Sequence, residues 1–151
     1  MRAYRRQREI SFAPRAKLTL LGKLLESHKD GRTIIFTTDN RTAYLIARLF
    51  LLPIITHQTK LAERIDILTK FRAGHYGAIV TARVLNEGVD VPEADVAVIV
   101  SGSGSVREHV QRLGRVLRKA PGKHAILYEL VTAQTGEEST STRRREHDAY
   151  R

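Results

Sequence analysis

Short apolar runs alternate with helically spaced apolar residues through the middle of the chain. Five runs of mainly aliphatic and β-branched residues predict strands, at residues 33–37, 53–56, 78–81, 96–100 and 125–131, and we expect the first to be fully buried. Between these runs the apolar spacing predicts helices, at about residues 14–30, 40–50, 61–72 and 106–119. Because strands that are apolar on both faces alternate with helices, we expect an α/β fold, a three-layer α-β-α domain with a mainly parallel sheet.

Capping and helix-breaking residues mark the ends of the expected helices. Pro14 suits a first helical turn, Asp30 and Gly31 end that helix, and Gly74 lies just after the third. Asp39 or Asn40 can cap the second helix. The residues that we expect the second and third helices to bury share a helical spacing: Ala43, Ile46, Ala47 and Phe50, and then Ile65, Leu68 and Phe71.

Composition limits the class of protein. The chain has 151 residues, of which 42% are hydrophobic and 28% charged, enough for one domain with a core. It has no cysteine, which excludes disulfides, thiolate metal sites and cysteine nucleophiles. No apolar run approaches the roughly 18 residues that span a bilayer, and the N-terminus lacks the apolar segment of a secretory signal. We therefore expect a soluble, intracellular protein with no membrane partner.

The charge is strongly basic and unevenly placed. Lys and Arg number 26 against 16 Asp and Glu, a formal net charge of +10, which favours polyanionic partners. Residues 1–8 contribute +4 and residues 139–151 contribute +2, which leaves +4 for the rest. These ends are solvated tails, nucleic-acid contacts or continuations into another domain. We expect a basic extension at 1–12, one domain at 13–136 and a polar basic tail at 137–151.

Polar residues gather where the expected strands end. Ligands of an open parallel sheet bind beyond the carboxyl ends of its strands. Hydroxyl, amide and guanidinium side chains follow four of them: Thr37, Thr38, Asn40, Gln58, Thr59, Arg83, Asn86, Ser101, Ser103 and Ser105. This set can follow a phosphodiester backbone through hydrogen bonds that carry no sequence information. Ordinary turn and capping chemistry also explains each residue separately, so both interpretations stay open.

The fourth expected helix combines an apolar stripe with a cationic face. The cationic face carries Gln111, Arg115 and Arg118 around Gly114, a residue that costs a helix about 1 kcal/mol relative to alanine. A solvated face normally interleaves acids with bases, and here only Glu108 lies near its edge. Two guanidiniums one turn apart can hold the oxygens of a phosphate. A phosphate site and a solvated helix face both fit the pattern.

The loop at residues 87–92 places a carboxylate at a strand end. Asp90, near the flexible Gly88, is a candidate acceptor for a ribose hydroxyl, or else it caps a turn before Pro92. The chain has no G-x-x-x-x-G-K-[ST] segment to cradle a triphosphate and no carboxylate pair after a strand to activate water. Its 6 histidines lack metal-ligand spacing, so we expect no metal site. The chain therefore has residues that can contact phosphate but lacks the P-loop and the carboxylate pair needed to hydrolyse a nucleotide.

Several segments, in this order, resemble a known family. Residues 111–118, Gln-Arg-Leu-Gly-Arg-Val-Leu-Arg, resemble motif VI of superfamily 2 helicases. Residues 87–92, Glu-Gly-Val-Asp-Val-Pro, resemble motif V, and residues 33–39 resemble motif IV. With the Ser-Gly-Ser-Gly-Ser segment at 101–105, the combination looks closest to the XPB family in its archaeal form. The run from about 17 to 135 is similar to the second RecA-like domain of these helicases.

The resemblance implies roles for individual residues. In this superfamily ATP binds between two RecA-like domains, the first of which supplies the P-loop and the acidic box that binds Mg²⁺. By motif position, Arg118 would be the arginine finger at the γ-phosphate, with Arg115 beside it. Gln111 would line the same cleft, and Gly88 and Asp90 would face the nucleotide. The sugar-phosphate backbone of DNA would lie against residues at three strand ends: Thr37, Thr38, Asn40, Gln58, Thr59, Thr81 and Arg83.

One position departs from the pattern of the family. Many relatives have Ser or Thr where this chain has Ala82. A hydroxyl contact to the nucleic-acid backbone is therefore either missing here or supplied by Thr81.

From the resemblance we expect the second RecA-like domain of an ATP-dependent DNA helicase or translocase of XPB type. It would supply the arginine finger and part of the DNA-binding surface, and the isolated chain would be inactive without a P-loop domain as its partner. Other expected partners are DNA and repair-nuclease or transcription-repair subunits, in the cytoplasm of an archaeal or bacterial cell or in a eukaryotic nucleus. Two rivals without ATPase activity remain: a stand-alone nucleic-acid-binding module and a partner-docking module.

Overall fold

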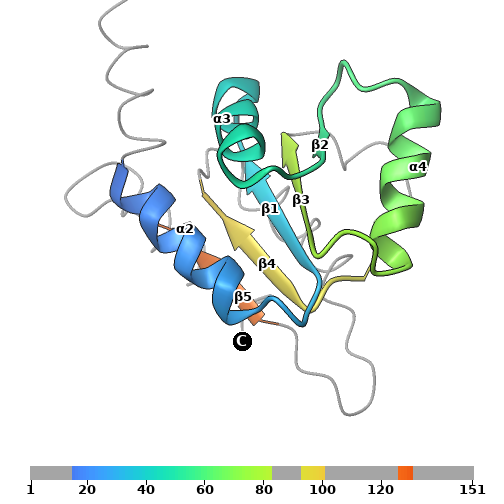
Figure 1. The fold of residues 1–151 in the computed structure, drawn as a ribbon. Helices are drawn as coiled ribbons and strands as arrows, with labels where there is room; N and C mark the ends of the chain where they lie inside the picture. The colour runs from blue at the N-terminus through green and yellow to red at the C-terminus, as the bar shows by residue number, and fades with distance from the viewer. Residues whose placement is uncertain (1–14, 83–92, 101–125, 131–151) are drawn as a thin grey trace, which may run out of the picture.

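A computed structural model of the chain describes residues 15–82, 93–100 and 126–130 (Figure 1). The helices and strands in these ranges are α2 (Arg15–Ser27), β1 (Thr33–Thr37), α3 (Asn40–Phe50), β2 (Ile54–Ile55), α4 (Leu61–Arg72), β3 (Ala78–Ala82), β4 (Val96–Ile99) and β5 (Ile126–Glu129). They follow the order expected from the sequence. The expected helix at 106–119 lies outside the described residues.

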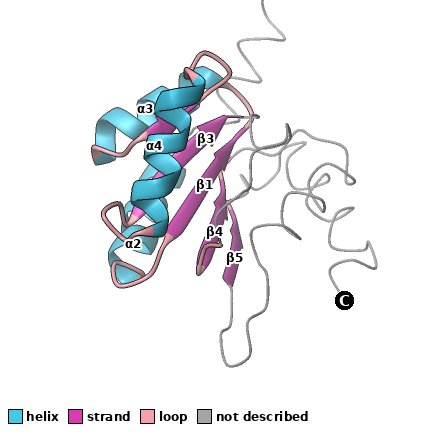
Figure 2. Cartoon of the chain, turned by 90° about the vertical axis from the view of Figure 1, so that its right-hand side faces the viewer, coloured by secondary structure: helices cyan, strands magenta, loops and turns pink. Residues whose placement is uncertain are grey.

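The strands form one parallel sheet in the order β2-β3-β1-β4-β5. β1 lies at its centre, where Ile35 is opposite Val80 on one side and Val98 on the other. Every residue of β1, β3 and β4 is buried, as runs that are apolar on both faces predict. β5 is an edge strand with partly exposed residues (Figure 2).

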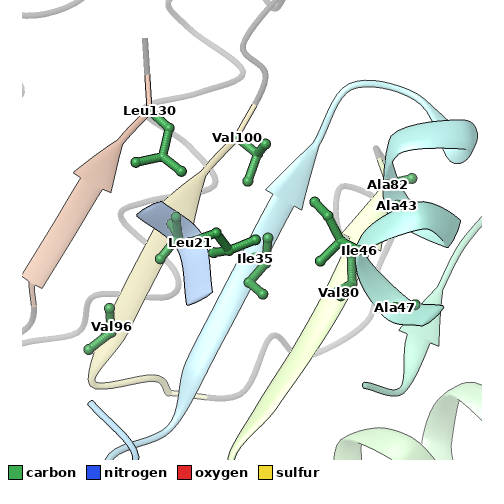
Figure 3. Close-up of a cluster of buried hydrophobic side chains, with 11 residues drawn as sticks. Leu21, Ile35, Ala43, Ile46, Ala47, Val80, Ala82, Val96, Val100 and Leu130 are labelled. Atoms are coloured by element: carbon green, nitrogen blue, oxygen red, sulfur yellow. The ribbon is translucent and has the colours of Figure 1, made fainter. Parts of the chain in front are cut away.

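Helices cover both faces of the sheet, which confirms the expected three-layer fold. α2 and α3 cover one face, where Leu21 and Ile46 pack with Ile35 (Figure 3). α4 covers the other face, where Phe71 packs with Ile34. Ile34 and Ile35 are neighbours in β1 and serve opposite faces, because side chains alternate along a strand.

The buried stripe of α4 differs from the predicted one. α4 buries Ile67, Leu68 and Phe71, whereas Ile65 is 54% exposed. The three buried residues lie three, four and seven positions after Arg64, so the stripe begins at this arginine. Ile65 lies about 100° further around the helix. The prediction for Ile65 is wrong because a half-buried charged residue takes the first position of the stripe.

The ends of α3 and α4 follow the expected local signals. The carboxylate of Asp39 caps α3 by accepting the N–H of Thr42 at 2.8 Å. Gly74, just after α4, has a φ of 81°, which glycine adopts without strain. On the surface of α4, Asp66 accepts a hydrogen bond from Lys70 Nζ at 2.7 Å and raises the pKa of that lysine.

The residue that follows α3 is strained. Leu51, the C-cap, has a φ of 53° and a ψ of 46°, in the left-handed region, and donates its N–H to Ala47 O. An L-residue costs about 1–2 kcal/mol in this region, where glycine is the usual choice. The side chain of Leu51 is 90% exposed, so burial does not offset that strain.

Leu51→Gly is therefore expected to raise the free energy of unfolding by about 0.5–1 kcal/mol, because glycine adopts the left-handed region without steric cost. Leu49→Gly is the matched control, since it also removes an exposed leucine but lies within the last turn of α3. There glycine is expected to lower the free energy of unfolding by about 1 kcal/mol. Urea denaturation of both variants measures the two effects, and shifts of the same sign would contradict the assignment of strain to Leu51.

Candidate functional site

The carboxyl ends of all the strands share one edge of the sheet, because the strands are parallel. β2 and β3 lie on one side of β1, whereas β4 and β5 lie on the other. The chain therefore crosses from one side of β1 to the other between β3 and β4. In open parallel sheets, ligands bind at the carboxyl edge where such a crossing occurs. We call this part of the molecule the carboxyl edge.

The residues after β1 are buried and engaged in local structure. Thr37 and Thr38 are both buried. The hydroxyl of Thr37 donates to Asp39 O at 3.0 Å and lies 3.5 Å from Thr81 O, so it ties the end of β1 to β3 and to the cap of α3. For Thr37, the structure thus shows the turn and capping chemistry that the sequence left open. Its contact with a nucleic-acid backbone stays a prediction.

The residues after β2 form a closed turn. The N–H of Thr56 donates to Thr59 Oγ1 at 2.9 Å, and the N–H of Thr59 donates to Thr56 O at 3.1 Å. The N–H of Gln58 donates to Thr56 Oγ1 at 3.2 Å, and the side chain of Gln58 is exposed at the tip of the turn. Asn40 Nδ2 lies 3.1 Å from Nδ1 of His57. The structure therefore brings the predicted residues Asn40, Gln58 and Thr59 together, through a histidine that the sequence analysis did not select.

Two polar groups on the α4 side of this edge have unmet hydrogen-bonding capacity. Among the described residues, Arg64 Nε and Thr81 Oγ1 are buried side-chain atoms without a hydrogen-bond partner. In the sheet register Thr81 is opposite Ile55, and Ile55 directly precedes Thr56 in the chain. The guanidinium of Arg64 donates from Nη2 to Thr56 O at 3.4 Å. Both groups therefore lie by the end of β2, and both can donate hydrogen bonds.

Arg64 is a second residue of this edge, after His57, that the sequence analysis did not select. The signal was available, since Arg64 shares the helical spacing of Ile67, Leu68 and Phe71. A charged residue that opens an apolar stripe lies where the helix meets the sheet. In α4 that position places the guanidinium beside the carbonyl of Thr56.

The structure shows where Ala82 lies, the position at which many relatives have Ser or Thr. Ala82 is buried in the core beneath α3, together with Ala43 and Val80. Thr81 has the opposite orientation in β3, on the side of α4, because side chains alternate along a strand. The hydroxyl that this strand end presents among the described residues is that of Thr81.

Arg83 and the predicted nucleotide-binding residues lie outside the described residues. The predicted nucleotide-binding residues are Gln111, Arg115, Arg118, Gly88 and Asp90. The fold nevertheless fixes where their segments begin. β3 ends at Ala82 and β4 ends at Ile99, on opposite sides of the carboxyl end of β1. From these two strand ends the chain continues into 83–92 and 101–125.

The described residues offer neither a metal centre nor a membrane span. Within 15–82, 93–100 and 126–130, no group of three or more histidine or acidic side chains is arranged to hold a metal ion. In the same ranges, no helix has the length and apolar character needed to cross a membrane.

The family that the chain belongs to, together with its fold, defines the class of protein, which is the C-terminal, RecA-like domain of a helicase. The chain belongs to the family described as helicase conserved C-terminal domain, which matches residues 16–120. The C-terminal domain of the DEAD-box protein Dbp5 has the same fold, with a TM-score of 0.77 over 90% of this chain and 80% of that one, at 20% identity.

Within this class, several curated relatives are proteins of the XPB family, which confirms the resemblance seen in the motifs. The chain is 42% identical over 144 residues to the DNA 3'-5' translocase XPB2 of Sulfurisphaera tokodaii, covering 95% of this chain and 33% of that protein. It is 38% identical over 122 residues to the DNA 3'-5' helicase XPB of Mycobacterium tuberculosis, covering 76% and 21%. The chain thus spans about a third or less of the curated relatives that it matches.

The cap of α3 sets the position of Asn40 at the carboxyl edge and can be tested alone. Asp39→Ala removes the acceptor for the N–H of Thr42 and is expected to lower the free energy of unfolding by about 0.5–2 kcal/mol. Asp39→Asn keeps an acceptor oxygen and is expected to cost less than half as much. Urea denaturation compares the two variants with the parent, and equal losses would show that the cap is not the cause.

Proposed function

We propose that this chain is the second RecA-like domain of an ATP-dependent DNA helicase or translocase of XPB type, and that its carboxyl edge binds the sugar-phosphate backbone of DNA. Membership of the helicase C-terminal family supports the first part, as do relatives named DNA 3'-5' translocase and DNA 3'-5' helicase. The observation that carries the second part is the pair of buried polar atoms without partners, Arg64 Nε and Thr81 Oγ1.

Phosphate oxygens of the DNA backbone would supply the acceptors that the two groups lack. Leaving a buried donor without an acceptor costs about 1–3 kcal/mol, so such a group normally has a water, an ion or a ligand as its partner. The hydrogen bond of the Arg64 side chain in the described structure goes to a carbonyl and not to a carboxylate, so its positive charge stays available. An arginine and a threonine hydroxyl are ordinary donors to phosphate oxygens.

Contacts of this kind suit a protein that moves along DNA. Hydrogen bonds to phosphates fix position without reading bases, which is what a sequence-independent translocase requires. Gln58 and Asn40, on the adjoining turns, extend the same polar edge. Thr37, Thr38, Thr59 and Arg83 complete the set of residues that we propose for DNA.

We propose the ATP-binding role from motif position. Arg118 and Arg115 would carry positive charge to the phosphates, Gln111 would line the cleft, and Gly88 and Asp90 would face the nucleoside. ATP supplies the free energy, and Mg²⁺ would be bound by the P-loop domain. An arginine that reaches the phosphates only when two domains close is worth about 10³–10⁵ in rate, and it couples hydrolysis to the closing motion.

Arg64→Met tests the DNA contact. Losing one charge-assisted contact to phosphate is expected to weaken binding of an oligonucleotide about tenfold and to reduce the slope of log affinity against log salt by about 1. Lys23→Met is the matched control, because Lys23 is an exposed residue of α2 and lies on the other face of the sheet. Fluorescence anisotropy at several salt concentrations measures both. Equal losses would show that net charge, and not the position of Arg64, governs binding.

Thr81→Val separates a binding role from a structural one. Valine has the shape of threonine without the hydroxyl, and this hydroxyl has no partner in the described structure. The variant is therefore expected to be at least as stable as the parent, yet to bind DNA less tightly, by about tenfold. A variant that loses stability and keeps its affinity would contradict the proposed contact.

The proposed catalytic role is tested by complementation. The isolated chain is expected to hydrolyse no ATP, and adding a P-loop domain of an XPB protein, fused or in trans, is expected to give DNA-stimulated hydrolysis. In that assembly Arg118→Ala should lower turnover by about 10³ or more while nucleotide affinity stays within about tenfold. Lys23→Ala is the control variant and is expected to leave the rate of ATP hydrolysis unchanged. DNA-stimulated hydrolysis by the isolated chain would contradict the proposal.

A further inference from the structure

α3 carries more apolar residues than the sheet beneath it uses. Opposite its buried stripe, Tyr44, Leu45 and Leu49 are 42%, 45% and 55% exposed. Leu51, at the end of the helix, is 90% exposed, and Arg48 lies exposed among them. We define these five residues as the outer face of α3. It is independent of the carboxyl edge and of the function proposed above.

Helical geometry makes the outer face one continuous surface. At 3.6 residues per turn, Tyr44, Arg48, Leu45 and Leu49 fall within about 140° of the helix circumference. Leu45 and Leu49 are one turn apart and therefore adjacent on the surface. Arg48 lies between Tyr44 on one side and these leucines on the other. Arg41, which is also exposed, falls within the same arc, so the surface is apolar with positive charge inside it.

The fold alone does not account for this surface. Scattered exposed apolar residues are ordinary, but contiguous ones mark interaction sites. Leu51 adds backbone strain to its exposure, since it occupies the left-handed region with its side chain in solvent. This conformation ends α3, since the N–H of Leu52 then donates to Ala47 O at 2.9 Å, but it does not account for the exposure of the leucine side chain.

The positive charge of the outer face indicates which kind of partner can bind there. Between Asn40 and Leu51 the chain has arginines and no acidic residue. A second copy of a chain with a net charge of +10 would be repelled. DNA would meet Arg48 but would leave the exposed leucines in water. A polypeptide segment that carries acidic and apolar side chains on one face satisfies both parts of the surface.

We propose that the outer face of α3 docks an acidic, amphipathic segment of a partner protein. Arg48 pairs with a carboxylate of that segment, and Leu45, Leu49 and Leu51 receive its apolar side chains. α3 begins at the carboxyl edge and extends about 16 Å away from it, so Leu51 lies at the far end of the helix. Such a partner can bind while the carboxyl edge is occupied.

Selection from a random library of 16-residue displayed peptides against the full chain tests the proposal. The enriched peptides are expected to combine acidic with apolar residues at helical spacing. Leu51→Gly and Arg48→Glu are each expected to weaken a synthetic copy of such a peptide about tenfold in fluorescence anisotropy. Leu51→Gly is informative because it is expected to stabilise the domain while it weakens binding. Lys23→Glu, an exposed charge reversal on α2, is the matched control and should leave binding unchanged.

Four outcomes would overturn the proposal. The first is that enriched peptides are not acidic, or bind both variants as well as the parent. The second is that vesicles containing phosphatidylserine bind the chain and lose binding with the same variants, which would make a lipid surface the occupant. The third is concentration-dependent self-association that Leu51→Gly abolishes. The fourth is displacement of the peptide by an added P-loop domain, which would make the outer face part of the contact between domains.

Discussion

The parallel pairing of β1 with β3 and β4 is the constraint on which the rest of the structure depends. β1 lies between its two neighbours with every side chain buried, so its register fixes both of them. Parallel pairing places the ends of β1, β3 and β4 on one edge. The polar residues after β1, the hydroxyl of Thr81 and the starts of the segments 83–92 and 101–125 all take their positions from this pairing.

The carboxyl edge shows how one residue can serve packing and binding together. Arg64 occupies the first position of the buried stripe of α4, so its aliphatic stem lies where an apolar side chain would otherwise lie. Its guanidinium ends beside Thr56 O with one nitrogen lacking a partner. A purely structural helix would gain stability from an apolar residue here. The retained charge therefore fits the proposed contact with a phosphate.

α3 divides its apolar residues between the fold and the surface. The residues facing the sheet join α2 and the strands in one core, whereas the outer face adds nothing to that core. Its strained C-cap runs against the usual preference for glycine at that position. Local rules are most often broken at functional sites, and here the broken rule and the exposed apolar surface coincide at Leu51.

The sequence by itself determined the elements, because the information is local: β-branched runs gave β1 and β3, Asp39 gave the cap of α3, and Gly74 followed the end of α4. The motifs also determined the family, because they hold chemistry at fixed spacing. Only the tertiary structure decided the strand order and the pairing of Asn40 with His57. These depend on contacts between segments far apart in the chain, and a hydropathy pattern records which residues avoid water but not which partners they meet.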